Sequence, residues 1–294
     1  VSTANAVVRA GAKPVFVDID SQTLNLDPAA VRDAITPNTR AIIPVHYAGV
    51  SCDMDAIMCL ADEFDLQVIE DAAQGVNAFY QDRALGTIGQ LGTYSFHQTK
   101  NVSCGEGGAL CINDPALIER AEVIREKGTN RSKFLQGAVD KYTWIDVGSS
   151  YLPSELTAAF LLGQLESAAT ITEMRRGVYQ RYRELLEPLA VSGKLTLPVI
   201  PESCTSNYHL FHIVLPTGEI RNGLLKWLNE QGIHAVFHYV PLHSSPMGVE
   251  IVGNQKTLPV TDSTSGCLLR LPIYPDLQPD QQARVVNEIN AFLS

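Results

Sequence analysis

The chain has 294 residues, 45% hydrophobic and 18% charged, with a formal net charge of −10. This composition allows a sizeable core and excludes an intrinsically disordered chain. The negative charge argues against a nucleic-acid groove, which needs clustered Lys and Arg, but not against a small anion held by backbone N–H groups. No apolar stretch is long enough to span a bilayer and no leader opens the sequence. We expect a soluble, cytoplasmic protein that binds neither nucleic acid nor membrane.

Strand and helix patterns alternate along the first half of the chain. Apolar runs typical of strands covered on both faces occur at residues 13–20, 40–47 and 66–71, and further strands are expected at 91–99 and 107–113. Helical patterns occur at residues 2–8, 27–35, 52–64 and 115–127. Asp27 is placed to cap the second of these helices. The alternation predicts a mostly parallel sheet with right-handed crossovers.

The second half has a different pattern. A long helical stretch covers residues 153–189 and is expected to break near 167–170. Strands are then expected at residues 208–215, 234–242 and 268–273, with helices at 219–231 and 279–293. The chain therefore divides into a large α/β domain at 1–165, a connecting helix at 166–192 and a smaller α+β domain at 193–294.

The cysteines and histidines give no sign of a metal site. The six cysteines form no C-x-x-C pair, and a zinc site or disulfide framework needs closer spacing or a small secreted chain. His209 and His212 are three apart on an expected strand, so their side chains point to opposite faces. We expect free thiols in a reducing compartment and no bound metal.

Polar residues follow two neighbouring strands, where a parallel α/β sheet places its ligands. Asp71 ends the run at 66–71, while Ser95, His97 and Lys100 lie at or just past the end of the next strand. An Asp and a Lys in one crevice suit pyridoxal 5'-phosphate (PLP), whose aldehyde forms a Schiff base with Lys and whose pyridine nitrogen needs an acidic partner. On spacing alone, a helix-capping Asp and a solvated Lys are the commoner explanation.

The exact amino-acid sequences of these segments are more specific than their spacing. The run S-F-H-Q-T-K-N at 95–101 is preceded by E-D-A-A-Q at 70–74 and followed by G-E-G-G at 105–108. Together they resemble the DegT/StrS family of fold type I PLP-dependent aminotransferases, which act on nucleotide-activated sugars. The resemblance covers essentially the whole chain. It implies a mostly parallel central sheet flanked by helices, with a smaller α+β C-terminal domain.

The resemblance implies a role for each residue around Lys100. Lys100 carries PLP as a Schiff base and moves the proton between the sugar and the cofactor, for which partial burial lowers its pKa usefully. Asp71 pairs with the pyridinium nitrogen. Gln74 lies beside the oxygen substituent of the ring, Ser95 binds the phosphate and His97 lines the same pocket.

Other implied residues lie further from the lysine. Ser150 stands where many relatives carry an Asn that reaches the phosphate across a homodimer interface. Arg131, His238 and His243 are candidates for binding the nucleotide-sugar substrate. The branch that converts dTDP-4-keto-6-deoxyglucose to dTDP-4-amino-4,6-dideoxygalactose is the most similar in detail, with L-glutamate as the expected amino donor.

Alternatives remain open at this stage. Relatives carry a Gly-Thr phosphate turn and a ring-stacking aromatic residue before the position that matches Val1, so a shortened, PLP-binding protein without turnover is one alternative. An aminotransferase for a UDP-linked or 3-keto sugar is another. The related dehydratases replace the lysine with His, so Lys100 argues against them. No G-x-G-x-x-G follows a strand, which argues against a nicotinamide enzyme.

Overall fold

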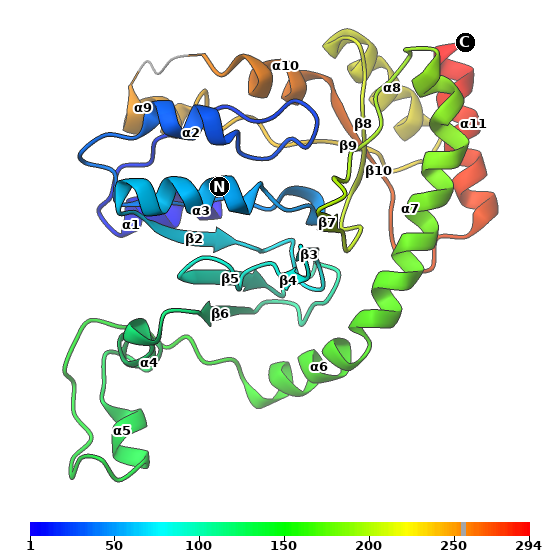
Figure 1. The fold of residues 1–294 in the computed structure, drawn as a ribbon. Coiled ribbons are helices and arrows are strands. Elements are labelled where there is room, and N and C mark those ends of the chain that lie inside the picture. Colours follow the sequence, from blue (N-terminus) through cyan, green and yellow to red (C-terminus); the bar gives the residue numbers. More distant parts are fainter. Residues whose placement is uncertain (254–256) are drawn as a thin grey trace.

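The computed structural model of the chain describes residues 1–253 and 257–294. Within them, the centre of the N-terminal half is a four-stranded sheet (Figure 1). Its order is β1 (Ala41–Ile42), β2 (Gln67–Asp71), β5 (Leu91–Ser95) and β6 (Gly108–Ile112). The first three strands are parallel, and β6 runs antiparallel to β5. The predicted mostly parallel sheet is therefore observed, with one antiparallel edge.

The observed strands are shorter than predicted, most clearly β9 at 236–237 where 234–242 was expected, and one expected strand is absent. Residues 13–18 form no strand, and Ile19 makes only a single bridge to Leu26. The carboxylate of Asp18 instead accepts hydrogen bonds from backbone N–H groups of the later helix α10 (Pro259–Cys267), which commits this segment to another contact. The strand expected at 40–47 ends at Ile42, because Pro44 has no N–H to donate to a ladder.

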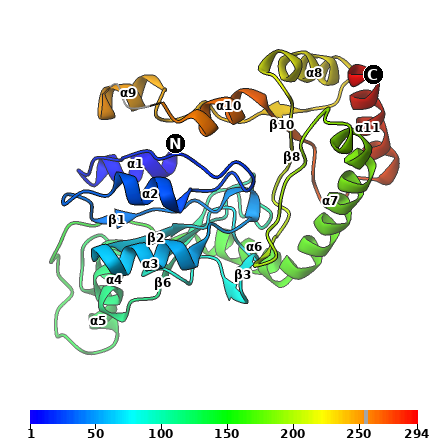
Figure 2. The same ribbon diagram turned by 45° about the horizontal axis from the view of Figure 1, so that its top comes forward.

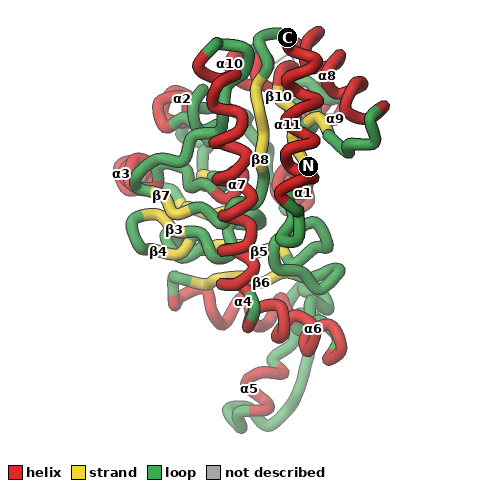
Figure 3. The backbone as a smooth tube through the Cα atoms, turned by 90° about the vertical axis from the view of Figure 1, so that its right-hand side faces the viewer, coloured by secondary structure: helices red, strands yellow, loops and turns green. Residues whose placement is uncertain are grey.

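Helices surround this sheet. Those of the N-terminal half are α1 (Ser2–Arg9), α2 (Pro28–Ala34), α3 (Met54–Phe64), α4 (Ile118–Arg125) and α5 (Arg131–Leu135), with short 3₁₀ turns η1 (Tyr47–Gly49) and η2 (Pro115–Leu117). Asp27 caps α2 as predicted, accepting from Ala29 N at 2.9 Å. Figure 2 shows α2 and α3 together on one side of the sheet. Figure 3 shows α5 projecting from the body with the loop that follows it.

The long helical stretch breaks at Ser167 into α6 (Glu155–Glu166) and α7 (Ala168–Val191), within the predicted interval. Figure 1 shows α7 running from the base of the sheet to the C-terminal part of the chain. Its buried face there includes Val178, Tyr182 and Leu186. The helix thus joins the two halves of the protein.

A second, antiparallel sheet of order β8 (Phe211–Val214), β10 (Leu268–Leu271) and β9 (Val236–Phe237) lies in the C-terminal half. Its remaining helices are α8 (Gly218–Glu230), α9 (Pro246–Val252) and α11 (Pro279–Leu293). Short strands β3 (Phe79–Tyr80), β4 (Arg83–Ala84) and β7 (Cys204–Thr205) form a third sheet. All six cysteines are free, as predicted. No helix among the described residues has the length and apolar character needed to cross a membrane.

Candidate active site

The ends of β2 and β5 bring Asp71 and Lys100 to the same edge of the sheet. Asp71 is the last residue of β2 and pairs with Thr93 on β5. Lys100 follows β5 by five positions. Lys100 lines a small cavity together with Gln74 and Ser95. Three of the expected site residues, Lys100, Gln74 and Ser95, therefore line one cavity, and Asp71 lies at the neighbouring strand end.

Lys100 is a half-buried amine whose pKa lies below its ordinary value of 10.5. Burial is the main cause, because a low-polarity surrounding disfavours the ammonium ion. The carboxylate of Asp71 acts in the opposite direction, and the guanidinium of Arg270 adds to the lowering. The result favours a neutral amine, the form that reacts with a carbonyl group.

The Asp71 carboxylate is held on both oxygens. Oδ2 accepts from the hydroxyl of Thr3 at 2.6 Å, and Oδ1 accepts from Ala73 N at 3.1 Å. Its backbone is fixed as well, with Asp71 N donating to Pro44 O and His46 N donating to Asp71 O. Thr3 in α1 is a partner that the sequence pattern did not reveal.

The residue before Asp71, Glu70, stabilises the backbone around the site. Its fully buried carboxylate accepts from the backbone N–H groups of Gly86, Ile88 and Gly89 at 2.6–2.8 Å, and Nε2 of His46 lies 2.9 Å away. Burial alone raises the pKa of Glu70, but these hydrogen bonds outweigh it and hold the pKa below its usual value. The two carboxylates therefore differ in role: Glu70 is structural, whereas Asp71 lies at the strand end and acts electrostatically on Lys100.

Gln74 is positioned by a turn that requires glycine. Its Oε1 accepts from Ala48 N at 2.7 Å, and Asn207 donates to Gln74 O and Val76 O, both at 2.7 Å. Gly49 has φ +79°, and a Cβ atom there would collide with the Asn207 side chain. Gly49 thus lets the C-terminal half reach the backbone around Gln74.

His209 also lines the Lys100 cavity, although it was considered from the sequence only as an unsuitable metal ligand. Its Nδ1 is 2.9 Å from Oδ1 of Asn101, whose Nδ2 donates to Asn207 O at 2.8 Å. Burial lowers the pKa of His209 well below 6.5, and the charges of Arg175 and Lys100 add to this. The imidazole is therefore neutral. It lies 108 positions from Asn101, so no local pattern could reveal the contact.

His97 points to its own loop and is not among the cavity-lining residues. Its Nδ1 is 2.8 Å from Thr99 Oγ1, and its Nε2 is 3.6 Å from Glu106. Ser95 Oγ accepts from His97 N at 3.3 Å, so the two predicted residues do contact each other. A cofactor contact for His97 remains a prediction.

Ser150 and Arg131 lie in the segment between α4 and α6, away from the cavity around Lys100. Arg131 Nη1 is 2.8 Å from Glu126 Oε2, and this bond lowers the pKa of Glu126. Ser150 is exposed and pairs through its backbone with Glu126. Figure 3 shows that α5, which Arg131 begins, projects from the body.

The two candidate histidines of the C-terminal half have different surroundings. His243 is buried, with Nε2 3.0 Å from Asp262 in α10. His238 lies against the Tyr47 ring, with the ring centres 5.0 Å apart. Its Nδ1 is buried and has no hydrogen-bond partner among the described residues. His238 thus lies beside Tyr47 of η1, in the N-terminal half, while His243 pairs with a residue of α10.

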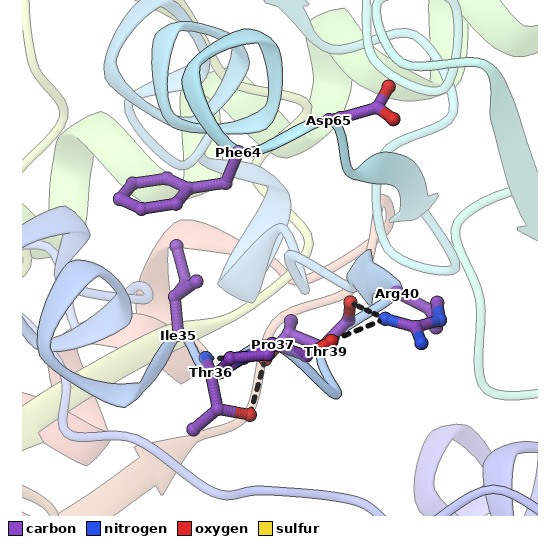
Figure 4. A pocket seen from close by; sticks show the side chains of 7 residues that line it. All are labelled: Ile35, Thr36, Pro37, Thr39, Arg40, Phe64 and Asp65. Carbon is purple, nitrogen blue, oxygen red and sulfur yellow. Dashed lines mark hydrogen bonds between the residues drawn. The ribbon is translucent and has the colours of Figure 1, made fainter.

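A second cavity lies at the opposite ends of the strands (Figure 4). Its lining includes Arg40, which directly precedes β1, and Asp65, which lies two residues before β2. The guanidinium of Arg40 is occupied by the carbonyls of Pro37 and Thr39, each at 2.8 Å. Because ligands of such sheets bind at the carboxyl ends of the strands, this cavity is not the active-site candidate.

Comparison with known proteins agrees with the site. The sequence pattern of the DegT/DnrJ/EryC1/StrS aminotransferase family matches residues 1–290. The chain belongs to this family. The family consists of PLP-dependent sugar aminotransferases, so the predicted enzyme class, cofactor and fold type I are confirmed.

Individual relatives resemble the chain over nearly its whole length. A pleiotropic regulatory protein of Geobacillus stearothermophilus is 39% identical, over 99% of this chain and 75% of its own. The solved structure of DesV from S. venezuelae, in complex with a ketimine intermediate, is 34% identical with a TM-score of 0.89, covering 100% of this chain and 76% of that one. NtdA of Bacillus subtilis, solved with the bound cofactor PMP, is 29% identical with a TM-score of 0.88, covering 99% and 65%.

The chemistry of the DegT/DnrJ/EryC1/StrS site fits PLP. Lys100 offers an amine of lowered pKa inside a cavity. Asp71 offers a carboxylate fixed by two hydrogen bonds, a suitable partner for a protonated ring nitrogen. Gln74 and Ser95 bring further polar groups to the same cavity.

Proposed function

We propose that this aminotransferase moves the amino group of L-glutamate to the keto carbon of dTDP-4-keto-6-deoxyglucose, giving dTDP-4-amino-4,6-dideoxygalactose. The supporting observation for transamination is the meeting of Lys100 and Asp71 at the carboxyl ends of β2 and β5. The sugar and nucleotide rest on the whole-chain resemblance, including K-G-T-N-R at 127–131. A UDP-linked or 3-keto acceptor is the alternative.

Each cavity residue has a proposed task. PLP, when bound, would supply an electron sink for the electron pair left on carbon when a proton is removed from the donor or the sugar. Lys100 holds the cofactor and, once released, carries that proton on Nζ, for which its lowered pKa suits it. Asp71 keeps the ring nitrogen protonated, oriented by Thr3 and Ala73 N. Gln74 contacts the ring and Ser95 the phosphate.

A homodimer is part of the proposal. Apolar side chains are exposed along residues 142–152 and on α6, including Trp144 (74% exposed), Val147 (77%) and Leu156 (85%). Exposed apolar groups gathered in this way are typical of a protein interface. Ser150 lies within the same stretch and is proposed to reach the partner's cofactor phosphate. The partly exposed Arg131 is proposed to contact the nucleotide-sugar, together with His238 and His243.

The proposed domain division follows the hydrophobic clusters. One cluster gathers buried residues between Val31 and Leu85, and the other gathers residues between Val178 and Ile289. This supports a large domain at 1–165, a connecting helix at 166–192 and a small domain at 193–294. Six free cysteines suit the proposed cytoplasmic location, where thiols stay reduced.

The function is tested by following the two half-reactions separately. The PLP-loaded protein should convert L-glutamate to 2-oxoglutarate, and the resulting form should aminate dTDP-4-keto-6-deoxyglucose, detected by mass spectrometry. Lys100→Ala should lose both, whereas Lys133→Ala, a control at an exposed ion pair, should keep both. Preference for a UDP-linked or 3-keto sugar would refute the substrate. Turnover by Lys100→Ala would refute the catalytic assignment.

A further inference from the structure

Buried polar atoms without partners gather beside the Lys100 cavity. Among the described residues, six buried side-chain nitrogen or oxygen atoms have no hydrogen-bond partner. Four of the six are Tyr47 Oη, His212 Nδ1, His238 Nδ1 and Arg270 Nε. Because buried polar atoms are normally satisfied, four such atoms in one place indicate a missing ligand more readily than scattered packing faults.

The four side chains form one cluster from two parts of the fold. His212 on β8 and Arg270 on β10 are directly opposite each other in the antiparallel sheet. The Tyr47 ring centre lies 5.7 Å from that of His212 and 5.0 Å from that of His238. Tyr47 belongs to η1, and its neighbour Ala48 bonds the side chain of Gln74. The cluster therefore extends from the residues next to Gln74, which lines the Lys100 cavity, to the sheet that contains β8 and β10.

Arg270 supplies the positive charge of this cluster. Burial, with Arg270 and His238 contributing, lowers the pKa of His212 to about 3. Burial and Arg270 lower the pKa of His238 to about 4. Burial raises the pKa of Tyr47, which therefore keeps its proton. At neutral pH the four residues present two neutral imidazoles, one phenol and one guanidinium.

No described residue neutralises Arg270. Its guanidinium makes no ion pair and no side-chain hydrogen bond within residues 1–253 and 257–294. An unpaired, partly desolvated charge is unfavourable, and an anion that supplies acceptor oxygens relieves it. The charge also lowers the pKa of Lys100, so the guanidinium acts electrostatically on the reacting amine.

Of the two anions that the substrates carry, the α-carboxylate of the amino donor suits Arg270 better than the diphosphate of the nucleotide-sugar. In an amino acid the α-carboxylate is two bonds from the amine nitrogen, so it must bind close to Lys100. The diphosphate of a nucleotide-sugar is separated from the keto carbon by the sugar ring. A planar guanidinium matches a carboxylate in a bidentate geometry, and a single positive charge balances a monoanion.

We propose that Arg270, aided by the hydroxyl of Tyr47 and an imidazole of His212 or His238, binds the α-carboxylate of the amino donor. This inference rests on the proposed aminotransferase function and adds a donor site to it. The donor would then lie between two parts of the fold. His212 on β8 and Arg270 on β10 contact it from one side, and Tyr47 in η1 contacts it from the other.

The test compares two probes on one set of variants. L-Glutamate and L-isoglutamine, whose α-carboxylate is an amide, are titrated calorimetrically into cofactor-free protein. The donor half-reaction of the PLP-loaded protein is measured in parallel. Arg270→Gln should weaken L-glutamate binding and raise its half-saturation about 10- to 100-fold, the loss expected for a charge-assisted contact. Its effect on L-isoglutamine should be under about threefold.

Controls separate this from a general defect. Arg176→Gln removes an arginine that pairs with Glu173 on the surface of α7, and it should behave like the unmodified protein. Arg270→Lys should restore part of the lost affinity, and Tyr47→Phe should cause a smaller loss than Arg270→Gln. The acceptor half-reaction should be little changed in Arg270→Gln.

Several outcomes overturn the donor site. These are equal L-glutamate affinity in Arg270→Gln and unmodified protein, no L-glutamate binding by the unmodified protein, or equal weakening of both probes. A loss of affinity confined to dTDP or to PLP assigns the cluster to a phosphate and also overturns it. If the proposed function fails instead, the half-reactions are absent while the calorimetric contrast between the probes remains readable.

Discussion

The stability of the protein should fall on mild acidification because buried histidines, His212 and His238 among them, stay neutral in the folded state. Burial and neighbouring cations lower the pKa of His212 to about 3 and that of His238 to about 4, from an ordinary 6.5. In the unfolded chain both accept a proton near pH 6.5. Their stabilising effect is thus complete above that pH and is lost as the pH falls toward the folded values. Between pH 7 and pH 5 each costs about 2 kcal/mol of unfolding free energy.

His212→Phe isolates one of these contributions. The Nδ1 atom of His212 has no partner, so the substitution breaks no bond at that atom and keeps an aromatic ring beside Tyr47. The variant should lose about 2 kcal/mol less than the unmodified protein between pH 7 and pH 5. Carboxylates with lowered pKa, such as Glu70, lose their contribution only as the pH falls below about 4.5, outside this interval.

Urea unfolding at pH 7, 6 and 5 measures the effect directly. The unmodified protein, His212→Phe and a control at the exposed His234, His234→Gln, are compared under the same ionic strength. The control should follow the unmodified protein. Equal acid sensitivity of His212→Phe and the unmodified protein would refute the assignment of His212 as a buried, neutral imidazole.

Three further predictions concern the site and the interface. Asp71→Asn should keep the fold and reduce turnover by orders of magnitude at matched PLP occupancy, because an amide cannot hold the ring nitrogen protonated; an unchanged rate removes Asp71 from the mechanism. Glu70→Gln should lower the unfolding free energy in urea by about 2–4 kcal/mol, since it weakens four buried hydrogen bonds; a loss below about 0.5 kcal/mol contradicts this. Phe160→Glu on the exposed face of α6 should shift a dimer toward monomer in light scattering, and an unchanged mass argues against this interface.

The sequence predicted those helices and strands that are determined by their own residues, such as a capping residue or an apolar stripe. The helix α11 was predicted at its observed bounds, because Pro279 opens it and Val285, Val286 and Ile289 form its buried stripe. The break between α6 and α7 and the strand end at Asp71 were found for the same reason, whereas the strand predicted at 91–99 ends earlier, at Ser95.

Long-range contacts decided the features that the sequence did not reveal. Residues 13–18 are apolar enough for a strand, but Asp18 is committed to the backbone of Thr261, 243 positions away. His209 reaches the Lys100 cavity through Asn101. Arg270 and Tyr47 meet only because two sheets come together, so neither residue carried a motif.

The central claim is that Lys100 is the residue that binds PLP covalently. Reduction of the PLP-loaded protein with borohydride, followed by peptide mass spectrometry, tests it most directly. We predict one modified site, the peptide that contains Lys100, and no such label in Lys100→Ala. A label on a different lysine, or an unlabelled Lys100 in protein that still turns over, would contradict the account.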